Sequence, residues 1–244
     1  MTRAELKKEA KETLKGRWGT AIAMILLYQL IIAGISLVTS VLPGIGSIAM
    51  FLITVPLSFG LIGQMIKFSR KEEVGICDYF SIGFGNFAKS WSIYGNTLLK
   101  LLPVIIVYIV SVVGMAILTF IAAVVEDTHA LIILIPLLVV VFILTYIMLI
   151  AKSYLYVLTN YIGNDNPELS GKQVVEKSQM IMKGHRWEYF VLSLSFIGWA
   201  LLSILTLGIG LLWLEPYIQV TTVKFYEHLV DEKKDNSNEV IINN

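Results

Sequence analysis

Four long segments of this chain contain no Asp, Glu, Lys or Arg. They cover residues 18–66, 101–125, 128–151 and 189–214, and the first alone is 49 residues long. A charge at the centre of a membrane helix costs roughly 2.5–3.5 kcal/mol on insertion scales. An apolar helix of about 20 residues is long enough to cross a bilayer. The pattern therefore predicts an all-α fold, a polytopic membrane helix bundle.

Turn residues divide the two longest apolar regions. The segment PGIG at 43–46 interrupts the first, and LGIG at 207–210 interrupts residues 189–223, where Glu215 is the one charged residue. Glycine and proline at such positions are typical of turns. We therefore predict six transmembrane helices paired as three hairpins. Their expected ranges are 19–42, 47–66, 98–124, 130–157, 188–205 and 211–228.

The basic residues fall on one side of these six helices. Of 19 Lys and Arg, six lie in 1–17, five in 67–100, five in 151–188 and three in 215–244. The three remaining turns contain none. Lys and Arg accumulate in cytoplasmic loops, so we predict a multi-pass protein of the cell membrane with both termini in the cytoplasm. Residues 1–230 form one integral membrane domain in this interpretation, and the polar residues 231–244 form a disordered cytoplasmic tail.

Two cytoplasmic segments are predicted to be interfacial amphipathic helices. Residues 3–16 and 171–183 each place apolar side chains on one helical stripe, and a Lys-Gly pair follows the stripe in both. Ser170 and Gln173 have the spacing of a capping box at the start of the second of these helices.

A tryptophan next to a polar or basic residue precedes each predicted hairpin. Trp18, Trp91 and Trp187 are the expected interfacial anchors, because tryptophan concentrates at the headgroup level of membranes. Two interpretations remain open. The chain contains three copies of one unit, each an interfacial helix, an anchor and a hairpin, or every helix that starts at the cytoplasm simply begins with a basic and aromatic anchor.

Glu215, Tyr217 and Lys152 are the candidate intramembrane polar site. An ionisable group at membrane depth is by default a functional hypothesis. A simpler interpretation applies to each charge. Glu215 lies five residues after the turn at 206–210, within reach of the outer headgroups, and Lys152 lies at a helix end, where a long side chain extends to the interface.

No catalytic motif, cofactor site or metal site is predicted. The chain lacks a nucleophile elbow, a phosphate-binding loop and an HExxH motif. Glu126, Asp127 and His129 form a polar outer patch, but contiguous loop residues seldom converge on one metal ion. The single Cys77 excludes an intramolecular disulfide. A net charge of +1 argues against nucleic-acid binding.

Several segments of the chain resemble one bacterial family. These are KSYLY at 152–156, NDNP at 164–167, SQMIMKG at 178–184, LSFIGW at 194–199 and LTLGIG at 205–210, together with LKGRW at 14–18. The chain is identified as a member of the integral membrane family catalogued as domain of unknown function 975. More distantly, it is similar to the membrane region attached to some glycerophosphodiester phosphodiesterases, without that enzyme's catalytic domain. The resemblance implies a multi-spanning membrane protein with no assigned activity.

These observations favour a non-enzymatic membrane protein. Our first hypothesis is a scaffold or accessory subunit in envelope or transport processes, with membrane lipids and other membrane proteins as partners and with no cofactor. The alternative is a small transporter or lipid/peptide translocator, in which Glu215 lines a polar path. The sequence does not indicate the oligomeric state.

Overall fold

A computed structural model describes residues 1–40, 44–125 and 128–242, and this part of the chain contains helices and no strand. The elements are α1 (Arg3–Leu14), α2 (Trp18–Ser40), α3 (Ile45–Ser69), α4 (Asp78–Gly85), α5 (Phe87–Val125), α6 (Thr128–Ser153), the 3₁₀ turn η1 (Tyr154–Tyr156), α7 (Thr159–Asp165), α8 (Gly171–Met182), α9 (Arg186–Leu205) and α10 (Leu211–Ile242). The predicted all-α fold is confirmed.

Within the described residues, five helical segments are long and apolar enough to cross a membrane. They are Trp18–Ser40, Gly46–Ser69, Phe87–Ile121, Ile135–Asp165 and Arg186–Leu205. The five segments indicate a multi-pass membrane protein.

The sixth predicted span lies in α10, which is not among these five segments. Beyond Leu214 the helix mixes apolar residues with charged ones such as Lys224 and Glu227. α10 packs against α1, α2 and α3, and its Val220 and Val223 are fully buried. The apolar residues of α10 are therefore covered largely by the protein itself.

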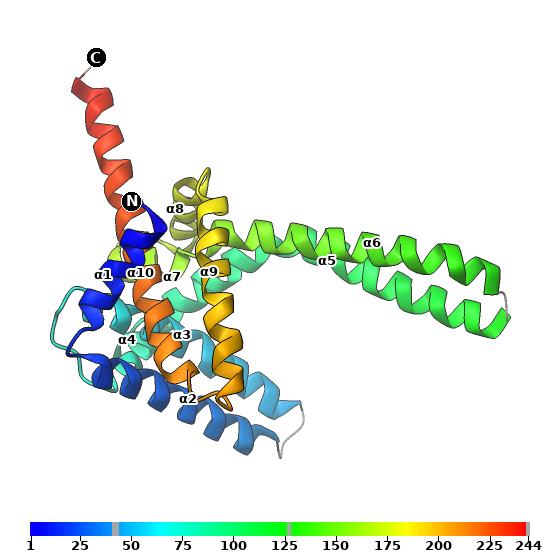
Figure 1. Cartoon of the computed structure of the whole chain (residues 1–244), viewed down its shortest axis with the longest axis horizontal. Helices are drawn as coiled ribbons and strands as arrows, with labels where there is room; N and C mark the ends of the chain where they lie inside the picture. The colour runs from blue at the N-terminus through cyan, green and yellow to red at the C-terminus, as the bar shows by residue number, and fades with distance from the viewer. Residues whose placement is uncertain (41–43, 126–127, 243–244) are drawn as a thin grey trace.

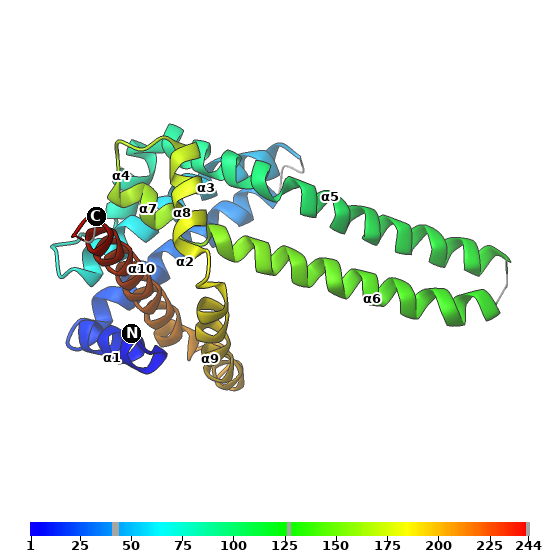
Figure 2. The same cartoon turned by 90° about the horizontal axis from the view of Figure 1, so that it is seen from above.

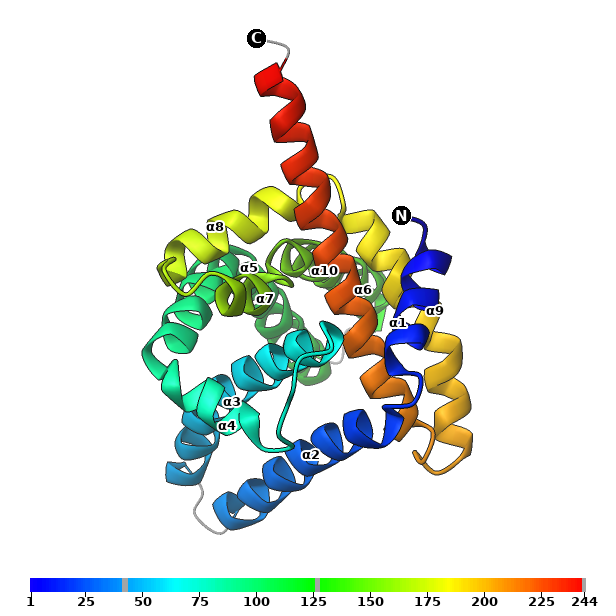
Figure 3. The same ribbon diagram turned by 90° about the vertical axis from the view of Figure 1, so that its left-hand side faces the viewer.

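The helices form a packed body from which one hairpin projects. α5 and α6 pack along each other and extend away from the remaining helices (Figure 1). Seen from above, this pair runs crosswise to α10 (Figure 2). In the end-on view, α1, α9 and α10 lie side by side at one edge of the body, and α4, α7 and α8 lie around the other (Figure 3).

The amphipathic helices α1 and α8 bury their apolar stripes inside the protein. Leu6, Ala10 and Leu14 of α1 are at most 3% exposed, and α1 packs on α10. In α8, Val174 and Met182 are fully buried, and this helix packs on α5, α7 and η1. The two helices exist as predicted. Their stripes are not free to enter a bilayer, however, because other helices of the same chain cover them.

The first and third repeats of the proposed unit share their local geometry. α1 begins with a capping box of Thr2 and Glu5, and α8 begins with one of Ser170 and Gln173. After these helices, Gly16 and Gly184 have φ of 77° and 100°, a region that favours glycine. The middle unit lacks the capping box of the other two, because no side chain caps the start of α4. The threefold repeat therefore stays a prediction.

The capping box of α8 is expected to contribute to the stability of the protein. Ser170→Ala removes the acceptor of the Gln173 backbone N–H and one bond to the Gln173 side chain. We expect the protein to lose about 1 kcal/mol of stability. Thermal unfolding in detergent, followed by circular dichroism, measures this loss. Ser170→Asp is the matched control, since aspartate also caps helices and should retain most of the stability.

α3 and α4 approach each other through glycines. A Cβ on Gly60 would meet the carbonyl oxygen of Tyr79, and a Cβ on Gly83 would meet the carbonyl oxygen of Pro56. Only hydrogen fits at either position, so the two backbones lie in direct contact. This crossing holds α4 on α3 and fixes where α5 begins.

The predicted disordered tail at 231–244 overlaps the end of α10, and its disorder stays a prediction. α10 continues as a helix to Ile242. Lys234 lies 3.5 Å from Asp231, an i, i+3 pair that favours helix. The polar segment therefore forms the last turns of α10, whose buried residues, such as Val220 and Val223, lie earlier in the same helix.

Candidate functional site

Glu215 and Tyr217 face different neighbours. Tyr217 is buried, its ring lies edge-on to Phe196 at 5.3 Å, and its hydroxyl donates to the carbonyl oxygen of Lys7 at 3.4 Å. Glu215 is half-buried and lies within electrostatic range of Tyr28 in α2. No described residue forms a hydrogen bond or an ion pair with Glu215. The two side chains therefore lie in different surroundings, and their role as one site stays a prediction.

Lys152 lies apart from both residues, in the last turn of α6. Its side chain is half-buried, and within the described parts of the chain it has no bonded partner. The structure thus does not bring together the three residues of the predicted intramembrane site.

The three predicted anchors occupy different environments. Trp187 is 71% exposed, whereas Trp18 packs partly against the core. Trp91 lies edge-on to Phe51 at 5.0 Å, and its Nε1 is buried with no hydrogen-bond partner in the described structure. Trp91 is therefore part of the packing between α3 and α5.

A larger polar cluster lies elsewhere, where the C-terminal ends of α3 and α7 meet the middle of α10. We call it the polar junction, and it consists of Arg70, Asn164, Asp165, Asn166, Tyr226 and Glu227. Its centre is Arg70, which caps the C-terminus of α3. The guanidinium donates to Asp165 Oδ1 at 2.8 Å and Oδ2 at 2.6 Å, and its Nε donates to Glu227 Oε1 at 3.0 Å.

Electrostatics favours the charged form of this arginine. Hydrogen bonding to Asp165, followed by that to Glu227, raises the pKa of Arg70 above its ordinary value, while partial burial opposes the rise. The side chains of Arg70, Asp165 and Glu227 are 36%, 21% and 23% exposed. Bidentate geometry with this degree of burial makes the pair stronger than an isolated surface ion pair.

Three consecutive residues each fasten a different part of the chain. Asn164 Nδ2 donates to the carbonyl oxygen of Phe59 in α3 at 3.0 Å. Asp165 Oδ2 also accepts from the Tyr226 hydroxyl of α10 at 3.0 Å. Asn166 accepts from Lys89 on its carbonyl oxygen at 2.6 Å and from Lys177 on Oδ1 at 2.8 Å. Segment 164–166 therefore connects α3, α5, α8 and α10.

Only an indirect signal for this junction is present in the sequence. NDNP at 164–167 contributes to the family resemblance, and it is a run of polar residues directly after an apolar helix. Its partners could not be identified from the pattern, because Arg70 and Asp165 are separated by 95 positions in the chain.

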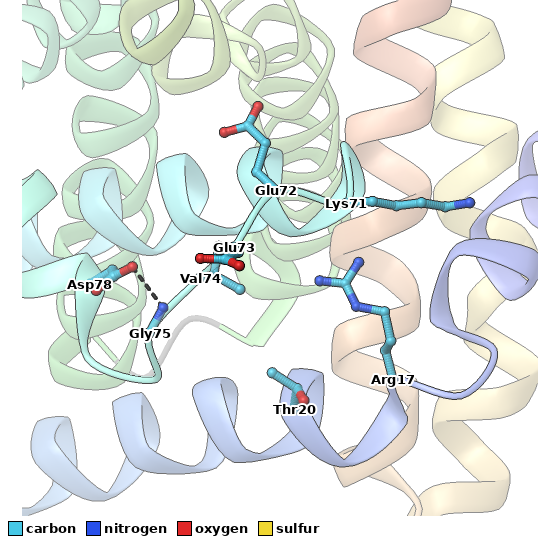
Figure 4. Close-up of a pocket in the computed structure, with 8 residues that line it drawn as sticks. All are labelled: Arg17, Thr20, Lys71, Glu72, Glu73, Val74, Gly75 and Asp78. Atoms are coloured by element: carbon cyan, nitrogen blue, oxygen red, sulfur yellow. Dashed lines mark hydrogen bonds between the residues drawn. The ribbon is translucent and has the colours of Figure 1, made fainter.

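A charged pocket of 830 Å³ lies between α2 and the segment that joins α3 to α4 (Figure 4). Arg17, the residue directly before α2, points into this space (Figure 4). Its guanidinium carbon lies 4.1 Å from the Phe68 ring centre, and its Nη1 donates to the Phe68 carbonyl oxygen at 3.0 Å. On the other side, Asp78 accepts from the Gly75 backbone N–H at 2.7 Å. The remaining lining residues are Thr20, Lys71, Glu72, Glu73 and Val74. The lining thus contains both basic residues, Arg17 and Lys71, and acidic residues, Glu72, Glu73 and Asp78, so it does not have a single sign of charge.

Two further pockets are largely apolar and open at the surface. One has a volume of 330 Å³, lies beside α9 and α10, and is lined by Lys11, Trp18, Trp199, Trp213 and Tyr217 among others. The other lies between α6 and α9 and includes Arg186 and Trp187. Two of the three predicted anchors therefore line apolar grooves.

The described residues contain no group of three or more His, Cys, Asp or Glu that could hold a metal ion. Glu126 and Asp127 of the polar outer patch lie outside the described residues, as does the side chain of His129.

Comparisons with known proteins place the chain in a family. No curated protein and no solved structure matches it. The family model described as "Protein of unknown function (DUF975)" matches residues 1–233, which include the whole polar junction and both apolar grooves. The chain therefore belongs to the DUF975 family, as its sequence motifs predicted.

Proposed function

We propose that this protein is a non-enzymatic scaffold or accessory subunit of the cell membrane, acting in envelope or transport processes. The observation that carries the proposal is the surface of the projecting α5–α6 hairpin. Val110 is 64% exposed, Phe120 is 70% exposed and Leu144 is 56% exposed, although all three are apolar. Exposed apolar surface of this extent is suited to lipid or to the helices of another membrane protein.

The packed body supports the same proposal. The polar junction joins the C-terminal ends of α3 and α7 to the middle of α10, and its Asn166 accepts from Lys89 near the start of α5, so the base of the hairpin is attached to the packed body. A rigid base with an exposed apolar arm is suited to presenting a binding surface, since little conformational entropy is lost when a partner binds a preorganised surface.

Photo-crosslinking in native membranes tests the scaffold role. A photoreactive amino acid replaces Val110, and the matched control replaces Val104 of the same helix, which is 8% exposed. We expect a discrete adduct with another membrane protein from position 110 and none from position 104. Recovery of a lone monomer from both positions would contradict the proposal.

We further propose six transmembrane helices in three hairpins, with both termini in the cytoplasm. The distribution of Lys and Arg supports this topology, and α10 would be its sixth helix. Cys77 tests the orientation of this topology, because it is exposed, lies between the second and third proposed helices and is the single cysteine of the chain. A membrane-impermeant maleimide should label Cys77 in inverted vesicles and leave it unlabelled in intact cells. Labelling in intact cells would place the 70–77 segment outside and reverse the topology.

The translocator alternative depends on Glu215. A half-buried carboxylate with no bonded partner among the described residues is suited to binding a transported cation or a polar group. Purified protein in liposomes should then show a flux of lipids, peptides or ions that Glu215→Gln abolishes. A flux unchanged by this substitution would eliminate that version of the alternative.

A further inference from the structure

The groove between α6 and α9 combines an apolar wall with a single cation. It has a volume of 440 Å³. Ile147, Ile150 and Ala151 of α6 form one wall, and Phe190 of α9 forms part of the other. Tyr154 completes the lining and lies 6.4 Å from Phe190, ring centre to ring centre.

Arg186 and Trp187 lie where this groove meets the start of α9. Arg186 is exposed, and no described residue forms a hydrogen bond or an ion pair with its guanidinium. The described lining contains no acidic residue. The acidic residue nearest in sequence, Glu188, is already bound to His185 at 3.0 Å. The guanidinium is thus available to an anion outside the protein.

We propose that this groove binds one phospholipid, whose phosphate contacts Arg186 and whose acyl chain lies against Ile147, Ile150 and Phe190. A guanidinium matches the geometry of a phosphate and can bind it through two parallel hydrogen bonds. Tryptophan beside it is suited to the boundary between headgroup and acyl chain. The proposal rests on the membrane location proposed above and is independent of the scaffold role.

The walls of the groove determine the class of ligand. They are continuous with exposed apolar surface, since Ile147 is 55% exposed and Trp187 is 71% exposed. A bilayer lipid can therefore enter sideways without leaving the membrane. A free phosphate would satisfy Arg186 but would leave the apolar wall uncovered, whereas an apolar molecule without phosphate would leave the arginine unpaired.

Trp91 is a buried counterpart to Trp187, and the two tryptophans differ in what surrounds their rings. Its ring contacts Phe51 at 5.0 Å and Tyr94 at 5.8 Å, and its Nε1 is buried. Trp187 contacts one ring, that of Phe190 at 5.0 Å, and otherwise faces the groove and the surface. The groove beside Trp187 therefore retains the space that side chains fill beside Trp91.

Native mass spectrometry of the full-length protein in detergent tests the site. The probes are dioleoyl phosphatidylglycerol and dioleoylglycerol, which share acyl chains and differ in the phosphate headgroup. We expect one tightly bound phosphatidylglycerol per chain and binding of dioleoylglycerol that is about tenfold weaker. Arg186→Gln should remove this preference. Glycerol 3-phosphate, added in excess, should not displace the bound lipid.

Two variants make the test specific. Lys183→Gln removes the same charge three positions away, at an exposed residue outside the groove, and should retain the preference. Ala151→Trp fills the apolar wall without changing charge and should abolish lipid binding. Equal effects of Arg186→Gln and Lys183→Gln, unchanged binding in Ala151→Trp, or displacement by glycerol 3-phosphate would each overturn the proposal. Failure of the protein to enter detergent micelles as a folded species would instead contradict the membrane location itself.

Discussion

Gly60→Ala is expected to destabilise the protein by about 1–3 kcal/mol, the usual cost of overpacking a well-packed site. Alanine normally stabilises a helix interior by about 0.5–1 kcal/mol relative to glycine. Here the added Cβ would meet the carbonyl oxygen of Tyr79 and the backbone nitrogen of Gly83 in α4. Neither neighbour is a flexible side chain, so α4 as a whole must shift to relieve the overlap.

Thermal unfolding in detergent measures this effect. Gly114→Ala is the matched control, because Gly114 also lies inside a helix and a Cβ there would have no atom within 4 Å. We expect the control to be neutral or slightly more stable, and Gly83→Ala to resemble Gly60→Ala, since its Cβ would meet the Pro56 carbonyl oxygen. If Gly60→Ala and Gly114→Ala behave alike, α3 and α4 are not in backbone contact.

Arg70→Gln is expected to cost about 1.5–3 kcal/mol, the range for hydrogen bonds to charged groups. The substitution removes three hydrogen bonds and leaves the carboxylates of Asp165 and Glu227 without their shared cation. Because the Arg70 side chain is 36% exposed, solvent compensates part of the loss, and we expect less than the cost for a fully buried pair.

A double-mutant cycle separates the pair from its surroundings. Asp165→Asn alone should also destabilise, and the double variant should be less destabilised than the sum of the two single variants, because the second change removes a partner already lost. Lys8→Gln is the control, since Lys8 and Glu12 lie 4.0 Å apart with side chains 77% and 65% exposed. We expect no measurable change there. Strict additivity of Arg70→Gln and Asp165→Asn would show that the two groups are not coupled.

Hydrogen exchange provides a second readout for Arg70→Gln. The junction joins the ends of α3 and α7 to the middle of α10, so amide protection should fall together in residues 159–165 and 223–229, far from the substituted position in sequence. If protection is lost only at the end of α3, Arg70 acts as a local helix cap and does not couple α3 to α7 and α10.

The helices were predictable because their signals are local. Apolar segments of span length, the glycine turns and the capping pattern at Ser170 and Gln173 each involve neighbouring residues, and a helix is closed by hydrogen bonds between residues four apart. The structure accordingly has helix boundaries at 18–40, 45–69 and 186–205 close to the expected ones. α10 differs most, since it continues to Ile242 and not only to the expected end at 228. α5 begins at Phe87, about three turns before its expected start at 98.

The candidate site was only partly predictable. Charge at membrane depth drew attention to Glu215, and the tryptophans next to basic residues indicated Trp18 and Trp187, which line grooves. The polar junction was not predicted, because each of its members, viewed alone, is an ordinary polar residue at the end or on the surface of a helix. Only their meeting across the fold gives them a common role.

The sequence by itself determined the family, the all-helical class and the apolar segments long enough to span a membrane, because these depend on motifs, composition and short-range periodicity. The tertiary structure decided where the amphipathic stripes of α1 and α8 are buried, which glycines bring α3 and α4 into contact, and which partner Arg70 selects. These contacts join residues far apart in the chain. Their geometry follows from how the helices pack, which a one-dimensional pattern does not encode.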